Sequence, residues 1–148
     1  MSNNRELNIL LVEDDDVACE AIIRSFAKHN IPFPLIIAHD GLEALQILRD
    51  QDPKEKIEDP LIILLDLNMP RMNGFEFLQE LRADSNLSSL VVFVLTTSND
   101  DSDRTRAYAE QIAGYMVKSM VGPHFRKLAD LLLSYRQTIS FPQQQKAS

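Results

Sequence analysis

Polar side chains follow several apolar runs in this chain, and their types suit the binding of a cation and a phosphoryl group. The run from Leu61 to Leu65 is uninterruptedly apolar and ends in the carboxylate of Asp66. The acidic residues 13–15 follow the apolar run nearest the N-terminus, Thr96 ends the run VVFVLT, and Lys118 ends GYMVK. A cation bound by the carboxylates, together with the ammonium and the hydroxyl, would place two positive charges and a hydrogen-bond donor around a phosphoryl group.

The acidic residues themselves indicate a metal site. Carboxylates crowded into one crevice repel one another, so they either take up protons or bind a cation. Oxygen ligands favour Mg²⁺ over zinc, which is typically bound by histidine or cysteine, and His29, His39 and His124 lie away from the acidic set. We therefore expect a magnesium site beside which Asp66 attacks phosphorus and becomes an acyl phosphate.

Strand-like and helix-like segments alternate along the chain. Short runs rich in Val, Ile and Leu predict strands at 8–13, 34–39, 61–66, 91–96 and 114–118. Helical periodicity predicts helices at 16–28, 42–49, 74–83, 101–111 and from Gly122 and Pro123 to 138. In the first helix we expect Asp16 as the N-cap. Its buried stripe should comprise Cys19, Ile22, Ile23 and Phe26.

Five such strand and helix units predict an α/β fold, specifically a flavodoxin-like doubly wound five-stranded parallel sheet with five helices in three α/β/α layers. In such a sheet, ligands bind outside the carboxyl ends of the strands, where all the polar groups above are expected. A length of 148 residues suits one domain, 1–148, with a core over about 7–138 and a C-terminal tail at 139–148. The charged stretch 49–60 is expected to be a loop.

The ordered motifs VEDDD, LLDLNMP, VLTTS and GYMVKS resemble those of the receiver domain of two-component response regulators. The resemblance covers about residues 7–138. It implies that Asp66 is the phosphoacceptor, and that Thr96 and Lys118 contact the phosphoryl oxygens. It further implies a Mg²⁺ site with Asp14 and Asp66 as direct ligands, Glu13 acting through water and Asn68 through its backbone carbonyl. Tyr115 matches the aromatic position that, with Thr96, forms the switch in this family.

Among receivers, the chain is most similar to the stand-alone response regulators of cyanobacterial phytochromes. The stretched loop before LIILLDLNMP, the serine after Lys118 and the extension beyond the last helix carry this resemblance. It implies a sensor histidine kinase of the phytochrome type as partner, with a downstream protein or phosphotransfer partner to receive the signal. The output would be a change of surface or of a dimer interface, for which the last helix and Phe141 are the candidates.

Two positions depart from the usual receiver pattern. Most receivers have a cis Lys-Pro bond where Ser119 follows Lys118 here, and a cis bond before a non-proline residue costs about 3 kcal/mol. The loop must therefore adopt another geometry or bear strain, and we expect Lys118 to function regardless. Asn73 stands where an aspartate is usual, and Asn73-Gly74 supports a tight turn because both residues tolerate positive φ.

Composition excludes several functional classes. A net charge of −7 and a pI near 4.9 argue against a nucleic-acid-binding surface. No apolar run approaches the roughly 18 residues that cross a bilayer, so we expect no membrane segment. The single cysteine, Cys19, and an N-terminus without signal-peptide order predict a cytoplasmic protein.

Other interpretations of the same residues are open. Residues 13–16 could serve only to cap the first helix, and Asp100, Asp101 and Asp103 are interpreted as solvated caps. A Mg²⁺-dependent phosphatase with an aspartyl nucleophile would instead place a D-x-D pair after the first strand. A flavin-binding module would have a Ser, Thr and Gly loop where VEDDDVAC stands. A receiver-like interaction module that works without phosphorylation is the remaining alternative. The receiver resemblance itself implies a signalling protein rather than an enzyme.

Overall fold

The computed structural model describes residues 7–52, 57–58, 60–122 and 125–138. Five parallel strands form one sheet: β1 (Asn8–Val12), β2 (Leu35–Ala38), β3 (Leu61–Leu65), β4 (Val91–Thr96) and β5 (Gly114–Val117). Their order is β2-β1-β3-β4-β5, with every neighbouring pair parallel. The predicted doubly wound flavodoxin-like sheet is thereby confirmed.

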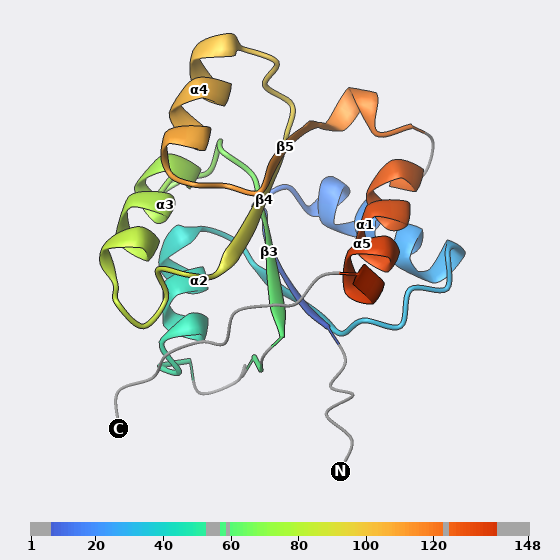
Figure 1. Ribbon diagram of the computed structural model, residues 1–148, viewed down its shortest axis with the longest axis horizontal. Coiled ribbons are helices and arrows are strands. Elements are labelled where there is room, and N and C mark those ends of the chain that lie inside the picture. Colours follow the sequence, from blue (N-terminus) through green and yellow to red (C-terminus); the bar gives the residue numbers. More distant parts are fainter. Residues whose placement is uncertain (1–6, 53–56, 59, 123–124, 139–148) are drawn as a thin grey trace.

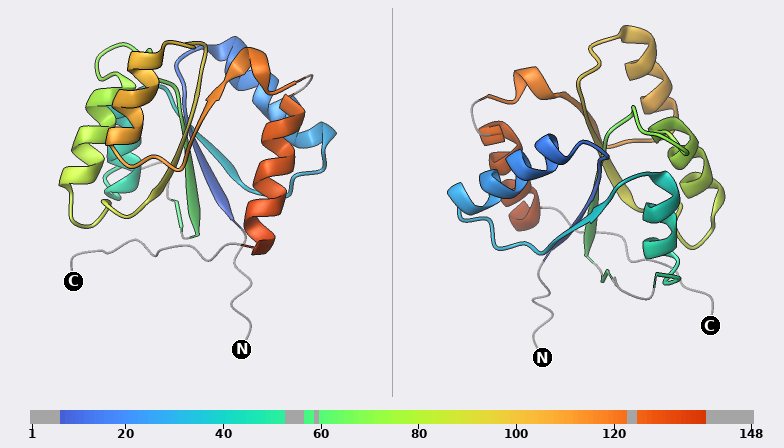
Figure 2. Two further views of the ribbon diagram at one scale, coloured as in Figure 1. Left: turned by 45° about the horizontal axis from the view of Figure 1, so that its top comes forward. Right: turned by 180° about the vertical axis from the view of Figure 1, so that it is seen from behind.

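Five α-helices connect and cover the strands: α1 (Asp16–Lys28), α2 (Gly41–Leu48), α3 (Gly74–Ala83), α4 (Asp101–Ala109) and α5 (Arg126–Thr138). Figures 1 and 2 show α1 and α5 on one face of the sheet and α2, α3 and α4 on the other. A 3₁₀ turn, η1 (Lys118–Met120), follows β5. This is the three-layer α/β/α arrangement expected from right-handed crossovers.

Alternate residues of the strands feed two separate apolar cores. Leu10 and Val12 pack with the helices α2, α3 and α4, while Ile9 and Leu11 pack with α1 and α5. All five residues of β3 are buried, as a central strand covered on both faces requires. Burying each such side chain contributes about 1.5–3 kcal/mol, so the central strands hold their carboxyl ends firmly in register.

The first helix differs from the prediction in its cap and in one buried position. Asp15 is the N-cap of α1, because its side chain accepts a hydrogen bond from the Val17 N–H at 2.9 Å. Ile23 is 44% exposed, whereas Ser25, which was not expected in the buried stripe, is buried. Asp16 is therefore the first helical residue and not the cap.

Left-handed residues explain two further differences in helix boundaries. α4 ends at Ala109 instead of 111, because Gln111 has a φ of 61° and turns the chain towards β5. α5 begins at Arg126, after Gly122 with φ 84° and Phe125 with φ 54°, neither of which an α-helix accepts. Pro123, which was expected to start this helix, lies outside the described residues, as do the tail and Phe141.

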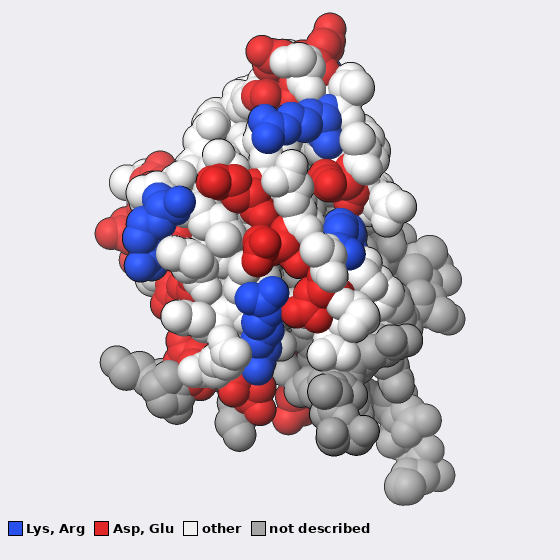
Figure 3. All heavy atoms as spheres, turned by 90° about the vertical axis from the view of Figure 1, so that its left-hand side faces the viewer, with Lys and Arg blue, Asp and Glu red and all other residues white. Residues whose placement is uncertain are grey.

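Surface charges of both signs are interspersed on the face formed by α2, α3 and α4 (Figure 3). At the C-terminal end of α2, Arg49 pairs with Asp84, which follows α3, at 3.0 Å between Nε and Oδ2. Near the N-terminal end of α2, Arg71 pairs with the buried carboxylate of Asp40. These two ion pairs therefore tie α2 to the segments before and after α3.

Candidate functional site

The ends of β1 and β3 place Glu13 and Asp66 beside each other. Val12 and Leu65 are register partners in the parallel pair β1–β3. The Asp66 N–H donates to the Val12 carbonyl at 3.0 Å, and the Glu13 N–H donates to the Ala38 carbonyl at 2.9 Å. The sheet itself therefore fixes the backbone from which both carboxylates extend, as the sequence predicted.

Three carboxylates meet at this edge of the sheet. One oxygen each of Glu13, Asp14 and Asp66 lies within 4.8 Å of the others. Glu13 and Asp66 are buried, at 1% and 7% exposure, whereas Asp14 is exposed. Three oxygen ligands with one side open to solvent form a donor set that fits a hard divalent cation with bound water.

Asp66 has an oxygen that the rest of the described chain does not use. Its Oδ1 atom is buried, and no side-chain or backbone group of the described residues donates a hydrogen bond to it. A buried carboxylate oxygen without a partner is costly. Such an oxygen in an acidic cluster is the kind of group that a metal ion or a phosphoryl group satisfies, so the residues fit both.

Lys118 reaches the cluster from the end of β5. Its Nζ lies 2.5 Å from Glu13 Oε1, and its side chain is 14% exposed. The ammonium therefore neutralises part of the acidic charge and stands next to the three carboxylates. The sequence placed Lys118 at this edge, but its pairing with Glu13 has no counterpart in any sequence pattern.

The carboxyl group of Glu13 holds its proton unusually tightly. Burial raises its pKa from 4.5 to about 7; the hydrogen bond from Lys118 acts in the opposite direction, and the negative charge of Asp66 adds to the increase. Near neutral pH the Glu13 carboxyl group is therefore protonated in part of the molecules and negatively charged in the rest. A bound cation would favour the charged form.

Thr96 closes β4 at the same edge and is fully buried. Its Oγ1 accepts a long hydrogen bond, 3.4 Å, from the Ser98 N–H. The Tyr115 hydroxyl donates to the Ser98 carbonyl at 3.0 Å. One residue, Ser98, therefore contacts both Thr96 and Tyr115, the two members of the expected switch.

Tyr115 is held on a second side by α4. The Arg104 guanidinium lies 5.1 Å from the centroid of the Tyr115 ring, within cation–π range. Arg104 is itself fixed by Asp101 and by Asn99. Sequence analysis missed both Ser98 and Arg104, because neither a backbone contact nor a stacked guanidinium leaves a spacing pattern.

The loop after Asp66 is packed against the start of α3. A Cβ atom at Gly74 would lie 2.6 Å from the Asp66 carbonyl oxygen and 2.7 Å from Leu67 Cα, so this position requires glycine. Asn73 caps α3 in a capping box with Glu76 and has a φ of −76°. Neither Asn73 nor Gly74 uses the positive φ that it tolerates, and Arg71 is the left-handed residue of this loop, with φ 62°. Asn68 lies exposed within the same loop.

The other acidic residues have ordinary structural roles. Asp100 caps α4 by accepting from the Ser102 N–H at 2.8 Å, and Asp103 accepts from the Ser98 hydroxyl at 2.7 Å. These contacts confirm the interpretation of this stretch as a helix start. Ser119 lies in the 3₁₀ turn η1, which is the geometry the chain adopts after Lys118.

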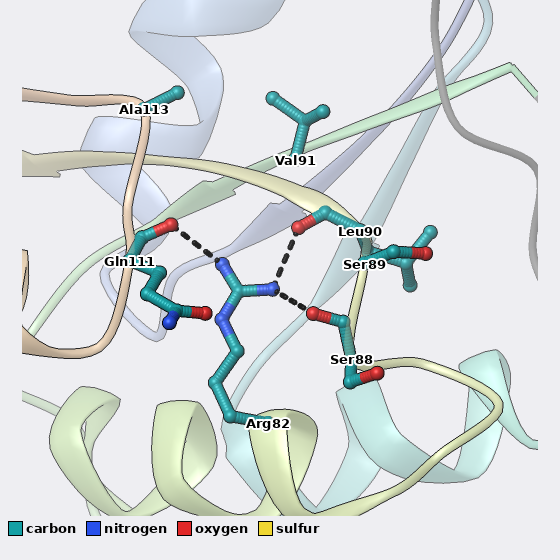
Figure 4. A pocket seen from close by; sticks show the side chains of 7 residues that line it. All are labelled: Arg82, Ser88, Ser89, Leu90, Val91, Gln111 and Ala113. Carbon is teal, nitrogen blue, oxygen red and sulfur yellow. Dashed lines mark hydrogen bonds between the residues drawn. The ribbon is translucent and has the colours of Figure 1, made fainter.

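A hollow of about 220 Å³ lies at the opposite end of the sheet and is not part of this cluster. It is lined by Arg82, by the segment 88–91 at the start of β4, and by Gln111 and Ala113 before β5. Figure 4 shows the Arg82 guanidinium directed at backbone carbonyls within it.

Across the described ranges, no helix is both long and apolar enough to cross a membrane.

Known proteins are similar to this chain in sequence and in fold. The sequence profile of the response regulator receiver domain matches residues 9–130. Response regulator Rcp1 from Synechocystis is 35% identical over 133 residues, which span 90% of this chain and 86% of Rcp1.

Two solved structures extend the comparison. The phosphorylated cyanobacterial phytochrome response regulator RcpA superposes with a TM-score of 0.80 at 27% identity, over 94% of this chain and 100% of RcpA. The Mn²⁺-bound form of Rcp1 superposes with a TM-score of 0.79 at 32% identity, over 93% of this chain and 99% of that structure.

Proposed function

This chain belongs to the response regulator receiver domain family, and on that premise we propose that Asp66 accepts a phosphoryl group from a sensor histidine kinase. The observation that carries the proposal is the buried Asp66 Oδ1, which lacks a hydrogen-bond donor among the described residues and lies in a cluster of three carboxylates beside Lys118. An isolated structural aspartate would have its oxygens satisfied.

In the proposed reaction, an Asp66 carboxylate oxygen attacks phosphorus while the phosphorus–nitrogen bond of a phosphohistidine breaks. The kinase imidazole leaves and takes up a proton, and Asp66 becomes an acyl phosphate. Asp14, Asp66 and the Asn68 backbone carbonyl would hold Mg²⁺, with Glu13 acting through water. The ion would neutralise charge on the phosphoryl oxygens.

Lys118 and Thr96 supply the remaining contacts to the phosphoryl group. Lys118 would release Glu13, to which it is paired in this structure, and would donate to a phosphoryl oxygen. Among the described residues, the hydrogen bond of the Thr96 hydroxyl is the long contact with Ser98, so the hydroxyl can turn towards the phosphoryl group at little cost. Both residues leave a present partner for a better charged acceptor.

The signal would then reach the surface through Ser98 and Tyr115. A movement of Thr96 towards Asp66 changes the Ser98 backbone, which holds the Tyr115 hydroxyl. Tyr115 would leave its place beside Arg104 and alter the surface formed by α4 and β5. A downstream protein, a phosphotransfer partner or a second copy of the chain would recognise this change.

The kinase partner is proposed to be of the phytochrome type. This proposal rests on the likeness to Rcp1 and to RcpA, which is a phytochrome response regulator.

The dimer interface is proposed to involve α5. A molecular mass that remains that of a monomer across the micromolar range, with and without phosphorylation, would contradict the dimer without affecting phosphoryl transfer.

Intact mass spectrometry tests the phosphoacceptor directly. The wild-type chain and Asp66→Asn are incubated with Mg²⁺ and acetyl phosphate, with and without a chelator. We expect the wild type to gain the mass of one phosphoryl group only when Mg²⁺ is present, and Asp66→Asn to gain none. Failure of the wild type with acetyl phosphate and with a phosphorylated phytochrome kinase would favour a phosphorylation-independent interaction module. Steady release of phosphate from small esters would instead indicate a phosphatase.

A further inference from the structure

Asp40 is a buried carboxylate whose two oxygens serve two different segments. It is 4% exposed. Oδ1 accepts from the Glu43 N–H at 2.9 Å and so caps α2. Oδ2 accepts from Arg71 Nε at 2.6 Å, and Arg71 Nη2 contacts the same oxygen. Asp40 thus links the start of α2 to the loop that follows β3.

Arg71 occupies a strained turn in that loop. Its φ is 62°, and the Met72 N–H donates to the Pro70 carbonyl at 2.7 Å across it. A tight turn of this kind with positive φ is disfavoured for a residue that carries a Cβ atom. It persists only where surrounding contacts hold it, so the partners of Arg71 and Met72 decide the course of the loop.

The next residue is attached to α2 as well. The Gly41 N–H donates to the Met72 carbonyl at 3.2 Å. A Cβ atom at Gly41 would lie 2.8 Å from Met72 Cγ, which shows how closely the two segments pack. The turn therefore has two hydrogen-bonded attachments to α2, one through a side chain and one through the backbone.

This turn closes the loop that carries Asn68. At the C-terminal end of the loop, Gly74 packs on the backbone of Asp66 and Leu67, and its N–H donates to the Leu67 carbonyl at 2.9 Å. Between that anchor and Asp66, Arg71 supplies the ion-paired side-chain attachment to α2, and the side chains of Met69 and Met72 add apolar contacts with the core. The orientation of the Asn68 peptide thus depends on both ends being held.

We propose that Arg71 and Asp40 are positioning residues for the divalent cation, since their ion pair sets the path of the loop that delivers the Asn68 carbonyl. The inference rests on the proposed function, which supplies the cation site. Neither residue touches the ion; both act through the backbone between Asp66 and Gly74. Loosening the pair should weaken cation binding while the three carboxylates stay in place.

Charge alone predicts a different pattern, and this makes the inference testable. Removing the positive charge of Arg71 would, by Coulomb's law, strengthen binding of a cation nearby, whereas removing the negative charge of Asp40 would weaken it. Positioning predicts weaker binding for both changes. It also predicts that the double variant is no worse than either single variant, because both remove the same pair.

The experiment measures the dissociation constant of Mg²⁺ by calorimetry for the wild type, Arg71→Ala, Asp40→Asn and the double variant. Asparagine keeps an oxygen for the helix cap, so Asp40→Asn remains informative if Arg71→Ala does not fold. Arg49→Ala is the matched control, because Arg49 makes a comparable pair with Asp84 at the other end of α2.

We expect about tenfold weaker Mg²⁺ binding for both single variants and the double variant, the low end of what loss of a supporting group causes. Arg49→Ala should bind as the wild type does. Phosphoryl uptake from acetyl phosphate should slow at low Mg²⁺ and recover at saturating Mg²⁺, since the nucleophile is intact.

Two results would overturn the inference. Unchanged or tighter Mg²⁺ binding by Arg71→Ala, with wild-type binding intact, would show that the pair does not position the loop and would leave the proposed function standing. Absence of Mg²⁺ binding by the wild type itself would refute the cation site and, with it, both proposals.

Discussion

Arg82 lies at the end of α3 near the start of β4, whereas Asp66 lies at the opposite end of the sheet, where β3 stops. The Arg82 guanidinium donates to the carbonyls of Ser88, Leu90, Glu110 and Gln111 at 2.8–3.0 Å, three of which are drawn in Figure 4. The buried oxygen of Asp66, by contrast, has no donor among the described groups.

The two charged groups differ in how their hydrogen bonds are satisfied: those of the half-buried Arg82 by the backbone, whereas Asp66 Oδ1 has no donor among the described residues. Arg82 ties the loop before β4 to the loop before β5, and its donors are used by the protein's own backbone. Asp66 is crowded by two other carboxylates, an arrangement that folding alone does not favour. The cluster around Asp66, where a buried oxygen lacks a hydrogen bond, is therefore a better candidate for a functional site than the hollow at Arg82, whose hydrogen bonds are made.

The largest effect on stability should come from Arg82→Ala. Removing the guanidinium leaves four carbonyls without their shared donor, so we expect the free energy of unfolding to fall by about 3 kcal/mol. Urea unfolding measures it, and Mg²⁺ binding should survive. Arg24→Ala, which removes an exposed pair with Glu20, is the control and should cost less than about 0.5 kcal/mol. Equal effects would mean that Arg82 is not a structural tie.

The next effect concerns pH and Glu13. The folded protein holds this proton up to about pH 7, whereas the unfolded chain loses it near 4.5. The metal-free protein should therefore lose stability as pH rises from about 4.5 to 7, on the order of 3 kcal/mol from this group, and level off above. Unfolding across this range, compared with Glu13→Gln, isolates the contribution. An identical pH slope for the two proteins would contradict the raised pKa.

A smaller effect of opposite sign is expected from Asp66→Asn. Neutralising one of three crowded carboxylates should raise the stability of the metal-free protein by about 1 kcal/mol. Mg²⁺ should stabilise the wild type and leave the variant nearly unchanged. Thermal unfolding with and without Mg²⁺ gives both quantities. A variant less stable than the wild type without metal would show that Asp66 is structural, like Arg82.

The smallest effect concerns Cys19, which lies beside the cluster of carboxylates and has no part in the proposed reaction. Burial first, and nearby carboxylates second, raise the pKa of its thiol to about 11. At pH 8 its thiolate should be about a hundredfold scarcer than that of an ordinary cysteine. Reaction with a thiol reagent should be slow in the folded protein and fast in urea. Rapid reaction of the folded protein would show that this side of the pocket opens readily.

The sequence was sufficient to predict the strands and the convergence of Glu13, Asp14, Asp66, Thr96 and Lys118 on one edge. Buried parallel strands are continuous apolar runs, and their ends mark where polar groups begin. The cap of α1 was misplaced by one residue, since four acidic residues stand in a row and only backbone geometry selects Asp15. The start of α5 was misplaced because the left-handed φ of Phe125 has no sequence pattern.

Contacts of a side chain with a group that is distant in the sequence could not be predicted. Three such contacts join residues whose separation along the chain follows neither helical nor strand periodicity. They are the hydrogen bonds of Arg82, the hydrogen bond of Tyr115 to Ser98, and the ion pair of Arg71 with Asp40. Such contacts depend on how loops meet after the sheet has formed. They are also the contacts that hold the candidate site, so the position of its residues could be predicted and the contacts that support them could not.

Chemical trapping of the acyl phosphate is the most direct test of the central claim. The wild-type chain is phosphorylated with acetyl phosphate and Mg²⁺, reduced with borohydride, digested and analysed by mass spectrometry. Reduction of an aspartyl phosphate converts that residue to homoserine, and we expect homoserine at position 66 only. Homoserine at another aspartate, or a phosphoryl group held solely on other residue types, would contradict the assignment of Asp66 as the phosphoacceptor.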